Sequence, residues 1–257
     1  MSILIEYIGA VAVIRFNRPK VFNSFNREMA LALQNALDEC QHNASVRAVM
    51  LIGEGKAFCA GQDLQEIVDP NGPTMQTILG EHYNPIILKI RQLRKPVVAA
   101  VNGVAAGAGA NIALSADITV AAASASFIQA FSKIGLIPDS GGTFALPRLV
   151  GFQRASALMM TGDKVSANDA LAMGMCYKVL PDEGFFDAAF AIAETLAAMP
   201  THGLWLTKNA LNQSMTNDLV TQLQTEETLQ IEAGATSDFN EGVQAFLEKR
   251  KPVFRGN

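Results

Sequence analysis

Cysteine is scarce in this chain: its three cysteines, Cys40, Cys59 and Cys176, lie in separate segments. An odd, scattered set does not form the disulfide framework that is typical of small secreted domains. Cys40 falls on the apolar face of an expected helix, and no base lies near Cys59 in the sequence. We therefore expect both to be packing residues rather than nucleophiles.

The chain also lacks a long hydrophobic run and an excess of positive charge. No apolar segment approaches the length of a membrane span, and no signal peptide opens the sequence. Lys and Arg total 20 residues against 24 Asp and Glu, which leaves no basic stripe for a nucleic acid. These absences predict a cytoplasmic protein that binds neither nucleic acid nor a membrane.

Hydrophobic residues are abundant, at 49% of 257, and they can bury a substantial core in one large domain or in one domain with an appendage. Strand-like and helix-like segments are mixed as far as residue 184, and only helices are expected beyond it. We therefore divide the chain into an α/β core over 1–195 and a helical region over 196–257. Apolar residues of this region, such as Leu219, Leu223 and Phe246, need a surface to pack on, which a second subunit can supply.

The expected elements follow from the period of the apolar residues and from the turn residues between them. Strands are expected in a hairpin over 3–16 and over 48–53, 97–101 and 177–180. Helices are expected over 27–41, 75–93, 151–160, 185–198, 203–214, 219–235 and 238–249, and another opens at the capping box Ser166-x-x-Asp169.

The most informative stretch runs over 96–142. A buried strand is followed there by glycines at 103, 107 and 109 and then by a helical run ending at Ser115. Small residues let a helix start close to the strand and leave its first N–H groups uncovered. Those groups can bind an oxygen that becomes negative during a reaction. Ile112 stands where a dinucleotide-binding motif requires a third glycine, and no P-loop follows, so close packing is the competing interpretation.

Two other sites can complete such chemistry. A second strand-to-helix turn, Ala60-Gly61-Gln62-Asp63, can supply another N–H to the same oxygen, although Asp63 is equally typical of a helix cap. Asp139 is a lone carboxylate in a glycine-rich turn over 135–142 with apolar neighbours. An oxyanion site beside one carboxylate favours proton transfer next to a carbonyl group.

His82, Tyr83 and Asn84 follow one another on the helix expected over 75–93. A base or nucleophile at His82 is conceivable, but no metal-ligand spacing or triad pattern surrounds it. A surface or packing role is favoured for His82, and Tyr83 and Asn84 are candidates for a pocket wall.

Several motifs are similar to those of one known family. They are Asn17-Arg18-Pro19, Ala57-Phe58-Cys59-Ala60-Gly61-Gln62-Asp63, Asn102-Gly103-Val104-Ala105-Ala106-Gly107-Ala108-Gly109 and Gly135-Leu136-Ile137-Pro138-Asp139-Ser140-Gly141-Gly142. In their order and spacing, the sequence resembles the crotonase (enoyl-CoA hydratase/isomerase) family over nearly its whole length. The resemblance implies an α/β fold, a crotonase-type spiral of β-β-α repeats with a helical C-terminal trimerisation region, and trimers often paired into hexamers. It also implies an acyl-CoA substrate and no metal or redox cofactor.

The same resemblance implies a role for each matching position. The backbone N–H groups of Gln62 and Ala108 would form an oxyanion hole for the thioester carbonyl. Coenzyme A would contact Gln62, Asp63, Leu64 and Gln65 with its adenine and Arg18 or Lys20 with its phosphates.

The acid and base positions depart from the pattern of the family's hydratases, which carry two glutamates that hold and activate a water. The matching positions here are Asn111 and Phe131, and neither can act as a general base. Simple hydration is therefore disfavoured, and Asn111 is expected to orient the substrate in a pocket that Phe131 also lines. Asp139 matches a position that isomerases and some dehalogenases use, but the only tryptophan, Trp205, lies among the C-terminal helices, which weakens the dehalogenase interpretation.

Within the family, the likeness is greatest to isomerases of phenylacetate degradation that convert ring-1,2-epoxyphenylacetyl-CoA to the oxepin and can shift the double bond of a 3-enoyl-CoA. The hypothesis is that the oxyanion hole polarises the thioester while Asp139 moves a proton between carbons. Two alternatives stay open. One is an enoyl-CoA hydratase or Δ3,Δ2-enoyl-CoA isomerase of fatty acid oxidation, and the other is a non-catalytic acyl-CoA-binding subunit.

Overall fold

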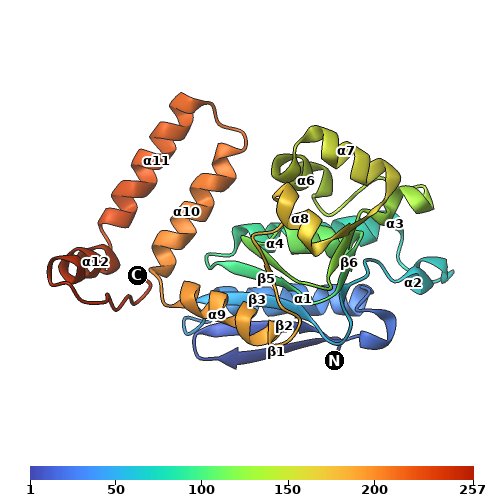
Figure 1. Cartoon of the computed structure of the whole chain (residues 1–257), viewed down its shortest axis with the longest axis horizontal. Coiled ribbons are helices and arrows are strands. Elements are labelled where there is room, and N and C mark those ends of the chain that lie inside the picture. Colours follow the sequence, from blue (N-terminus) through green and yellow to red (C-terminus); the bar gives the residue numbers. More distant parts are fainter.

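A computed structural model describes residues 1–257 as two β-sheets surrounded by helices, with a helical arm at the C-terminal end (Figure 1). The larger sheet has six strands, in the order β1 (Ile3–Ile8), β2 (Val11–Phe16), β3 (Ala48–Gly53), β5 (Val97–Val101), β7 (Ile118–Ala122) and β10 (Lys178–Leu180). The smaller sheet has four, in the order β4 (Ala57–Cys59), β6 (Val104–Ala106), β8 (Ser126–Ile128) and β9 (Lys164–Ser166). The predicted hairpin is confirmed, because β1 and β2 pair antiparallel.

Three successive strand pairs, β3–β4, β5–β6 and β7–β8, each contribute their first strand to the larger sheet and their second strand to the smaller sheet. They are followed by helical segments, namely α2 (Leu64–Val68), α5 (Ala108–Leu114) and η3 (Ala130–Ile134). Glycine permits the sharp turn between the members of a pair, since a Cβ atom on Gly53 would lie 2.1 Å from the carbonyl oxygen of Ala57. A Cβ atom on Gly103 would lie equally close, 2.1 Å, to that of Lys56. The predicted spiral of β-β-α repeats is confirmed.

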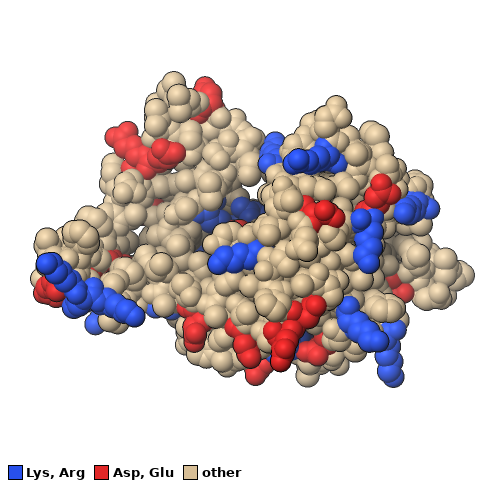
Figure 2. Space-filling view, in the orientation of Figure 1, with Lys and Arg blue, Asp and Glu red and all other residues tan.

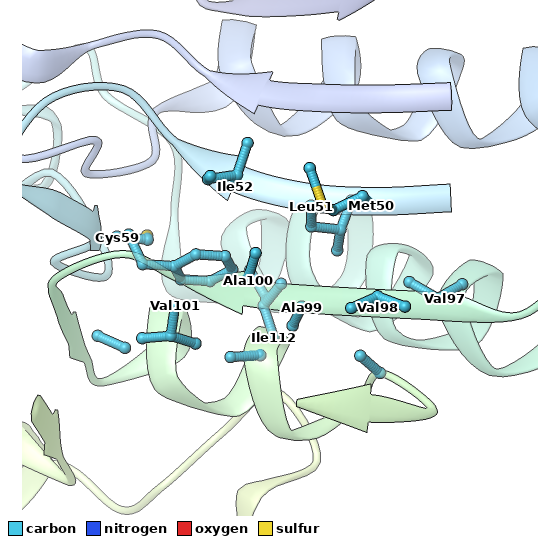
Figure 3. Close-up of a cluster of buried hydrophobic side chains, with 14 of the residues drawn as sticks. Met50, Leu51, Ile52, Cys59, Val97, Val98, Ala99, Ala100, Val101 and Ile112 are labelled. Atoms are coloured by element: carbon cyan, nitrogen blue, oxygen red, sulfur yellow. The ribbon is translucent and has the colours of Figure 1, made fainter. Parts of the chain in front are cut away.

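The core lies around the larger sheet, whose central strands β3 and β5 are buried along their whole length. This burial is typical of parallel strands covered on both faces. Figure 3 shows part of this core, in which Met50 of β3 lies opposite Val98 of β5 and Ile112 of α5 belongs to the same buried cluster. Helices α1 (Arg27–His42) and α9 (Phe185–Ala197) pack against this sheet. Cys40, Cys59 and Cys176 are buried and unpaired, as free packing residues would be.

Most predicted helices are confirmed, with two differences. The further helices are α4 (Asn84–Gln92), α6 (Gly142–Val150), α7 (Phe152–Thr161), α8 (Ala167–Met173), α10 (Thr201–Ser214), α11 (Leu219–Gly234) and α12 (Ser237–Leu247), with a short 3-10 helix η1 (Pro19–Val21). The single helix predicted over 75–93 is instead three consecutive segments, α3 (Met75–Thr77), a π-helix η2 (Ile78–Tyr83) and α4. The sequence pattern does not predict α6, which follows a glycine-rich turn and contains Pro147.

The C-terminal arm consists of α10 and α11, which lie side by side and extend away from the sheets, followed by α12 (Figure 1). Lys208 of α10 is buried at the base of the arm, where its Nζ lies 2.9 Å from Oδ2 of Asp117 and 2.7 Å from the carbonyl oxygen of Ile90. The predicted boundary at residue 195 falls in the last turn of α9, and the division into two regions stays a prediction. None of the helices combines the length and apolar character that crossing a membrane would need.

Candidate active site

A pocket of about 160 Å³ opens between the end of β4, the start of α5 and the segment around η3. Its wall is mostly apolar, with contributions from residues such as Ile67, Ile78 and Phe131. Tyr83 and Asp139 are the only ionisable residues on the wall. The pocket therefore combines one carboxylate with surroundings of low polarity.

Two glycine turns meet at this pocket. Strands β4 and β6 are parallel neighbours, so the turns that follow them leave the same edge of the smaller sheet. Gly61 has a φ of 94°, and a Cβ atom there would lie 2.9 Å from the carbonyl oxygen of Ala106 and 3.5 Å from the amide nitrogen of Ala108. Gly107, with a φ of 54°, immediately precedes α5. Glycine suits both positions because other residues are strained in this conformation.

Gln62 and Ala108 each contribute an unpaired backbone N–H at this junction. Ala108 is the first residue of α5, where backbone N–H groups have no acceptor within the helix. On either side of Gln62, the carbonyl of Gly61 accepts from Phe25 at 2.7 Å and the N–H of Asp63 donates to Phe25 at 2.8 Å, whereas the N–H of Gln62 forms no hydrogen bond within the chain. Two such donors beside one pocket can stabilise an oxygen on which negative charge develops.

Asp139 is held by a turn of unusual backbone conformation. The next residue, Ser140, is buried and has a φ of 50°, a left-handed conformation that residues other than glycine rarely adopt. Its hydroxyl donates to Oδ1 of Asp139 at 2.8 Å. Burial raises the pKa of Asp139 above the ordinary value, and the hydrogen bond from Ser140 opposes part of this rise. A raised pKa makes the carboxylate a stronger base.

Asn111 lies behind Asp139 and not on the pocket wall, contrary to the interpretation from the sequence. Its Nδ2 donates to the main-chain carbonyl of Asp139 at 2.8 Å, and its Oδ1 accepts from Nε2 of Gln129, also at 2.8 Å. A Cβ atom on Gly142 would lie 2.3 Å from Nδ2 of Asn111, so glycine is needed there for the close approach. The amide of Asn111 is thus engaged in holding the turn that carries Asp139.

The other residues predicted for the pocket divide into two groups. Phe131 and Tyr83 line the wall, and the Tyr83 hydroxyl donates to the side chain of Gln62. Asn84 is exposed at the start of α4 and is not among the residues that line the pocket, so its role there stays a prediction. His82 is buried outside the pocket with its Nε2 3.1 Å from Nη1 of Arg27, and burial lowers its pKa. This placement agrees with a packing role for His82.

The residues expected to meet coenzyme A lie beside the pocket, on α2 and η1. Asp63 is the N-cap of α2 and accepts from the N–H of Gln65 at 3.1 Å. It also pairs with Arg18, whose Nη2 lies 2.8 Å from its Oδ2. Leu64 is exposed at the edge of the pocket, and Lys20 is exposed on η1. Arg18 therefore has a partner within the chain, whereas the ammonium group of Lys20 is open to solvent.

This combination of fold and site corresponds to a known family. The family model for enoyl-CoA hydratase/isomerase matches residues 6–257. The chain belongs to the enoyl-CoA hydratase/isomerase family. This is the crotonase family that the sequence motifs indicate.

Individual members of the enoyl-CoA hydratase/isomerase family align over the whole chain. It is 47% identical over 260 residues to the 1,2-epoxyphenylacetyl-CoA isomerase of Escherichia coli (strain K12), covering 100% of this chain and 99% of that protein. It is 45% identical over 255 residues to a probable enoyl-CoA hydratase of Rhodobacter capsulatus, covering 99% and 98%. The crystal structure of an enoyl-CoA hydratase from Bacillus anthracis has a TM-score of 0.93 at 35% identity and covers 100% of both chains. These relatives are named for different reactions, so membership of the family does not identify the reaction of this chain.

Some parts of this family site were not predicted from the sequence. Glu66 bonds to the Gln62 side chain, and the four-residue spacing between them was the only available signal. Nothing in the sequence connects either residue with Tyr83, which lies on a different segment. The support of Asp139 by Asn111 and Gln129 was likewise missed, because the contacts join residues from three separate elements.

Proposed function

We propose that this chain is an acyl-CoA isomerase that moves a proton within its substrate. One observation carries the proposal: Asp139 is the only carboxylate on the wall of a pocket at which the N–H groups of Gln62 and Ala108 are unpaired. A thioester carbonyl bound to these N–H groups makes the adjoining carbon more acidic, because they stabilise the enolate oxygen. An isomerisation needs only one base, since the proton removed is also the proton returned.

For a 3-enoyl-CoA, the carboxylate of Asp139 takes a proton from C2, and the resulting dienolate places its negative charge on the thioester oxygen. The protonated Asp139 then returns the proton to C4, which leaves the double bond between C2 and C3. The raised pKa of Asp139 favours the first transfer. No atom or electron is gained or lost, so this proposal requires no redox cofactor, and the N–H groups of Gln62 and Ala108 take the part that a metal would otherwise play in stabilising the enolate oxygen.

The sequence identity to the E. coli 1,2-epoxyphenylacetyl-CoA isomerase supports a ring epoxide as a further substrate. Loss of a proton beside the thioester assists the rearrangement of the epoxide to the oxepin, and the product is again an isomer of the substrate. The apolar wall around Phe131, Ile67 and Ile78 suits a phenyl-derived ring or an alkyl chain.

Hydration is the competing reaction, and the probable hydratase of R. capsulatus makes it the first alternative. A hydratase needs groups that hold and activate a water. Asn111 is engaged with Asp139 and Gln129, and Phe131 offers an apolar ring close to Gly107. The further alternatives are a Δ3,Δ2-enoyl-CoA isomerase of fatty acid oxidation, which shares this chemistry, and an acyl-CoA-binding subunit without catalysis.

The proposal is tested by incubating the purified protein with a 3-enoyl-CoA and, separately, with crotonyl-CoA in water, both followed by mass spectrometry. Asp139→Asn is compared with Asp182→Asn, which changes an exposed aspartate bonded to Ser124 outside the pocket. We expect a shifted double bond without added mass, lost in Asp139→Asn and kept in Asp182→Asn. Efficient hydration of crotonyl-CoA, or full isomerase activity of Asp139→Asn, would show that the proposal is wrong.

We also propose that coenzyme A lies along the segment 62–65 with its phosphates near Lys20. The support is the exposure of Lys20 on η1, whose N-cap Arg18 pairs with Asp63 at the start of α2. Lys20→Glu should raise KM for an acyl-CoA but leave KM for the matching acyl-pantetheine unchanged, because only the former carries the nucleotide phosphates. Equal effects on both substrates would contradict this placement.

We also propose that the chain assembles into a homotrimer or a hexamer through its C-terminal arm. Figure 2 shows acidic side chains on the arm and basic ones near α12, with uncharged surface between them. The large apolar side chains exposed on the arm and α12 include Leu211, Leu219, Val220, Leu223, Ile231, Phe239, Val243, Phe246 and Leu247. A second apolar set, Phe144, Phe152 and Met160, is exposed on α6 and α7. When one face of each chain contacts a different face of the next chain, the subunits can close into a ring. Light scattering of the purified protein would give the number of subunits.

A further inference from the structure

We propose that Tyr83 is a positioning residue that holds the N–H of Gln62 in place for the oxyanion hole. This inference rests on the proposed function of that N–H. Tyr83 acts here through the Gln62 side chain and not by transferring a proton to the substrate. The inference is carried by a chain of hydrogen bonds, by the helix that places Tyr83 and by the absence of other regular structure around Gln62.

The hydrogen bonds fix the side chain of Gln62 in one orientation. The Tyr83 hydroxyl donates to Oε1 of Gln62 at 2.8 Å, and Nε2 of Gln62 donates to Oε2 of Glu66 at 2.9 Å. The other oxygen of Glu66 accepts from the N–H of Arg27 at 2.8 Å. Because a carboxylate can only accept, Glu66 requires the amide nitrogen of Gln62 on its own side and leaves the amide oxygen for Tyr83.

The π-helix η2 places Tyr83 for this contact. A π-turn adds a residue to a helical turn and is frequent at functional sites. At the end of η2, the consecutive residues His82 and Tyr83 are both buried, and Tyr83 is only 1% exposed. The Tyr83 ring also packs against Phe25, with 6.1 Å between the ring centroids. Phe25 is the residue whose main chain bonds to both neighbours of Gln62.

Gln62 belongs to no helix and no strand, and its only regular main-chain pairing is an isolated bridge with Phe25. The main-chain bonds fix the carbonyl of Gly61 and the N–H of Asp63. The carbonyl of Gly61 belongs to the same peptide group as the N–H of Gln62, so the bond from Phe25 already restrains that group, while the N–H itself makes no bond within the chain. The Tyr83–Gln62–Glu66 chain adds a second restraint, because it holds the side chain of Gln62 and thereby limits the movement of its main chain.

The same geometry excludes Tyr83 as the acid of the reaction. Its single proton is engaged with Oε1 of Gln62, so the hydroxyl has no proton to donate into the pocket. Burial and the nearby Asp139 raise the pKa of Tyr83 well above that of a free tyrosine, which keeps the hydroxyl protonated. Proton transfer is thereby left to Asp139.

The test uses Tyr83→Phe, with Tyr7→Phe as the matched control. Tyr7 is exposed on β1, and its hydroxyl also bonds a glutamate, Glu39, outside the pocket. The probe is acetoacetyl-CoA, whose enolate carries negative charge on oxygen and absorbs in the near ultraviolet, and butyryl-CoA serves as a ligand that forms no stable enolate. We expect Tyr83→Phe to weaken binding of the enolate about tenfold, as for one lost hydrogen bond, while the affinity for butyryl-CoA and all values for Tyr7→Phe stay unchanged.

A double-mutant cycle with Gln62→Ala separates positioning from a general structural role. If Tyr83 acts through Gln62, Tyr83→Phe should reduce kcat on the 3-enoyl-CoA in the native background and have no further effect in Gln62→Ala. Additive losses, or equal weakening of acetoacetyl-CoA and butyryl-CoA, would overturn the inference. A native protein that binds no enolate would overturn the oxyanion hole as well, whereas enolate binding that is the same in Tyr83→Phe would overturn the inference alone.

Discussion

The side chain of Asn111 donates a 2.8 Å hydrogen bond to the main-chain carbonyl of Asp139, the proposed base. Its oxygen accepts from Gln129, which is also buried, and Asn111 does not line the pocket. By resemblance, hydratases of the family use this position for water chemistry. Here it supports the turn that carries the single carboxylate of the pocket, which favours proton transfer over hydration.

Removal of this support should impair catalysis more than binding. We expect Asn111→Ala to lower kcat about tenfold and stability by about 2 kcal/mol, because two buried hydrogen bonds are lost. Asn102→Ala is the matched control, since the Asn102 amide also makes two hydrogen bonds, in its case to the main chain of Gly53 and Gly55 between β3 and β4. Comparable melting temperatures with a loss of kcat in Asn111→Ala alone would support the assignment, and equal kcat values would contradict it.

Activity should depend on the ionisation of Asp139. Burial raises its folded pKa, and the base must be deprotonated, so kcat should fall as the pH is lowered through that raised pKa. The midpoint should lie above the ordinary aspartate value. The pH profile of kcat on a 3-enoyl-CoA gives this midpoint, and a midpoint at or below the ordinary value would contradict the burial of the carboxylate.

The same carboxylate should cost stability at neutral pH. A pKa that is higher in the folded than in the unfolded chain favours folding below the unfolded pKa, and this contribution is lost as the pH rises through the folded pKa. Asp139→Asn should therefore raise the melting temperature at neutral pH, with a gain that disappears when the pH falls below the unfolded pKa. Thermal unfolding across this range, with Asp182→Asn beside it, measures the difference.

Gly61 should tolerate no side chain. Its φ of 94° and the 2.9 Å from a Cβ atom to the carbonyl of Ala106 predict that Gly61→Ala shifts the turn that carries Gln62. We expect a loss of about 2 kcal/mol in stability and a fall in kcat. Gly234→Ala, at the end of α11 with nothing within 4 Å of the new Cβ atom, should leave both unchanged or raise stability slightly. An active, stable Gly61→Ala would refute the proposed geometry.

Lys208 should be essential for docking the base of the arm. Burial lowers its pKa, and Asp117 partly opposes this. Lys208→Met leaves Asp117 with Arg91 as its remaining charged partner and should cost about 3 kcal/mol, as for other broken buried pairs. Lys164→Met, at an exposed position on β9, is the control. Chemical denaturation of both variants compares the losses, and equal stability would show that the pair is dispensable.

Sequence patterns predicted the parts of the fold that depend on nearby residues. The hairpin, the buried strands β3 and β5 and the starts of several helices follow from local apolar periods and caps, as at the start of α8, where the Ser166 side chain accepts from the N–H of Asp169. The helix expected over 75–93 was wrong in its interior, because the π-helix turns both His82 and Tyr83 inward. Which residues of this helix are buried depends on partners from other segments, and the local spacing of apolar residues carries no information about those partners.

The site shows the same division. The groups available for chemistry can be read from the residues alone: glycines that permit positive φ at Gly61 and Gly107, a lone carboxylate at Asp139 and no glutamate at position 111 or 131. Which of these groups meet depends on how the chain folds. Parallel pairing of β4 with β6 brings the two turns together, and packing commits Asn111 to Asp139 and Tyr83 to Gln62. The reason is that a buried polar group must bond to whatever the fold places beside it.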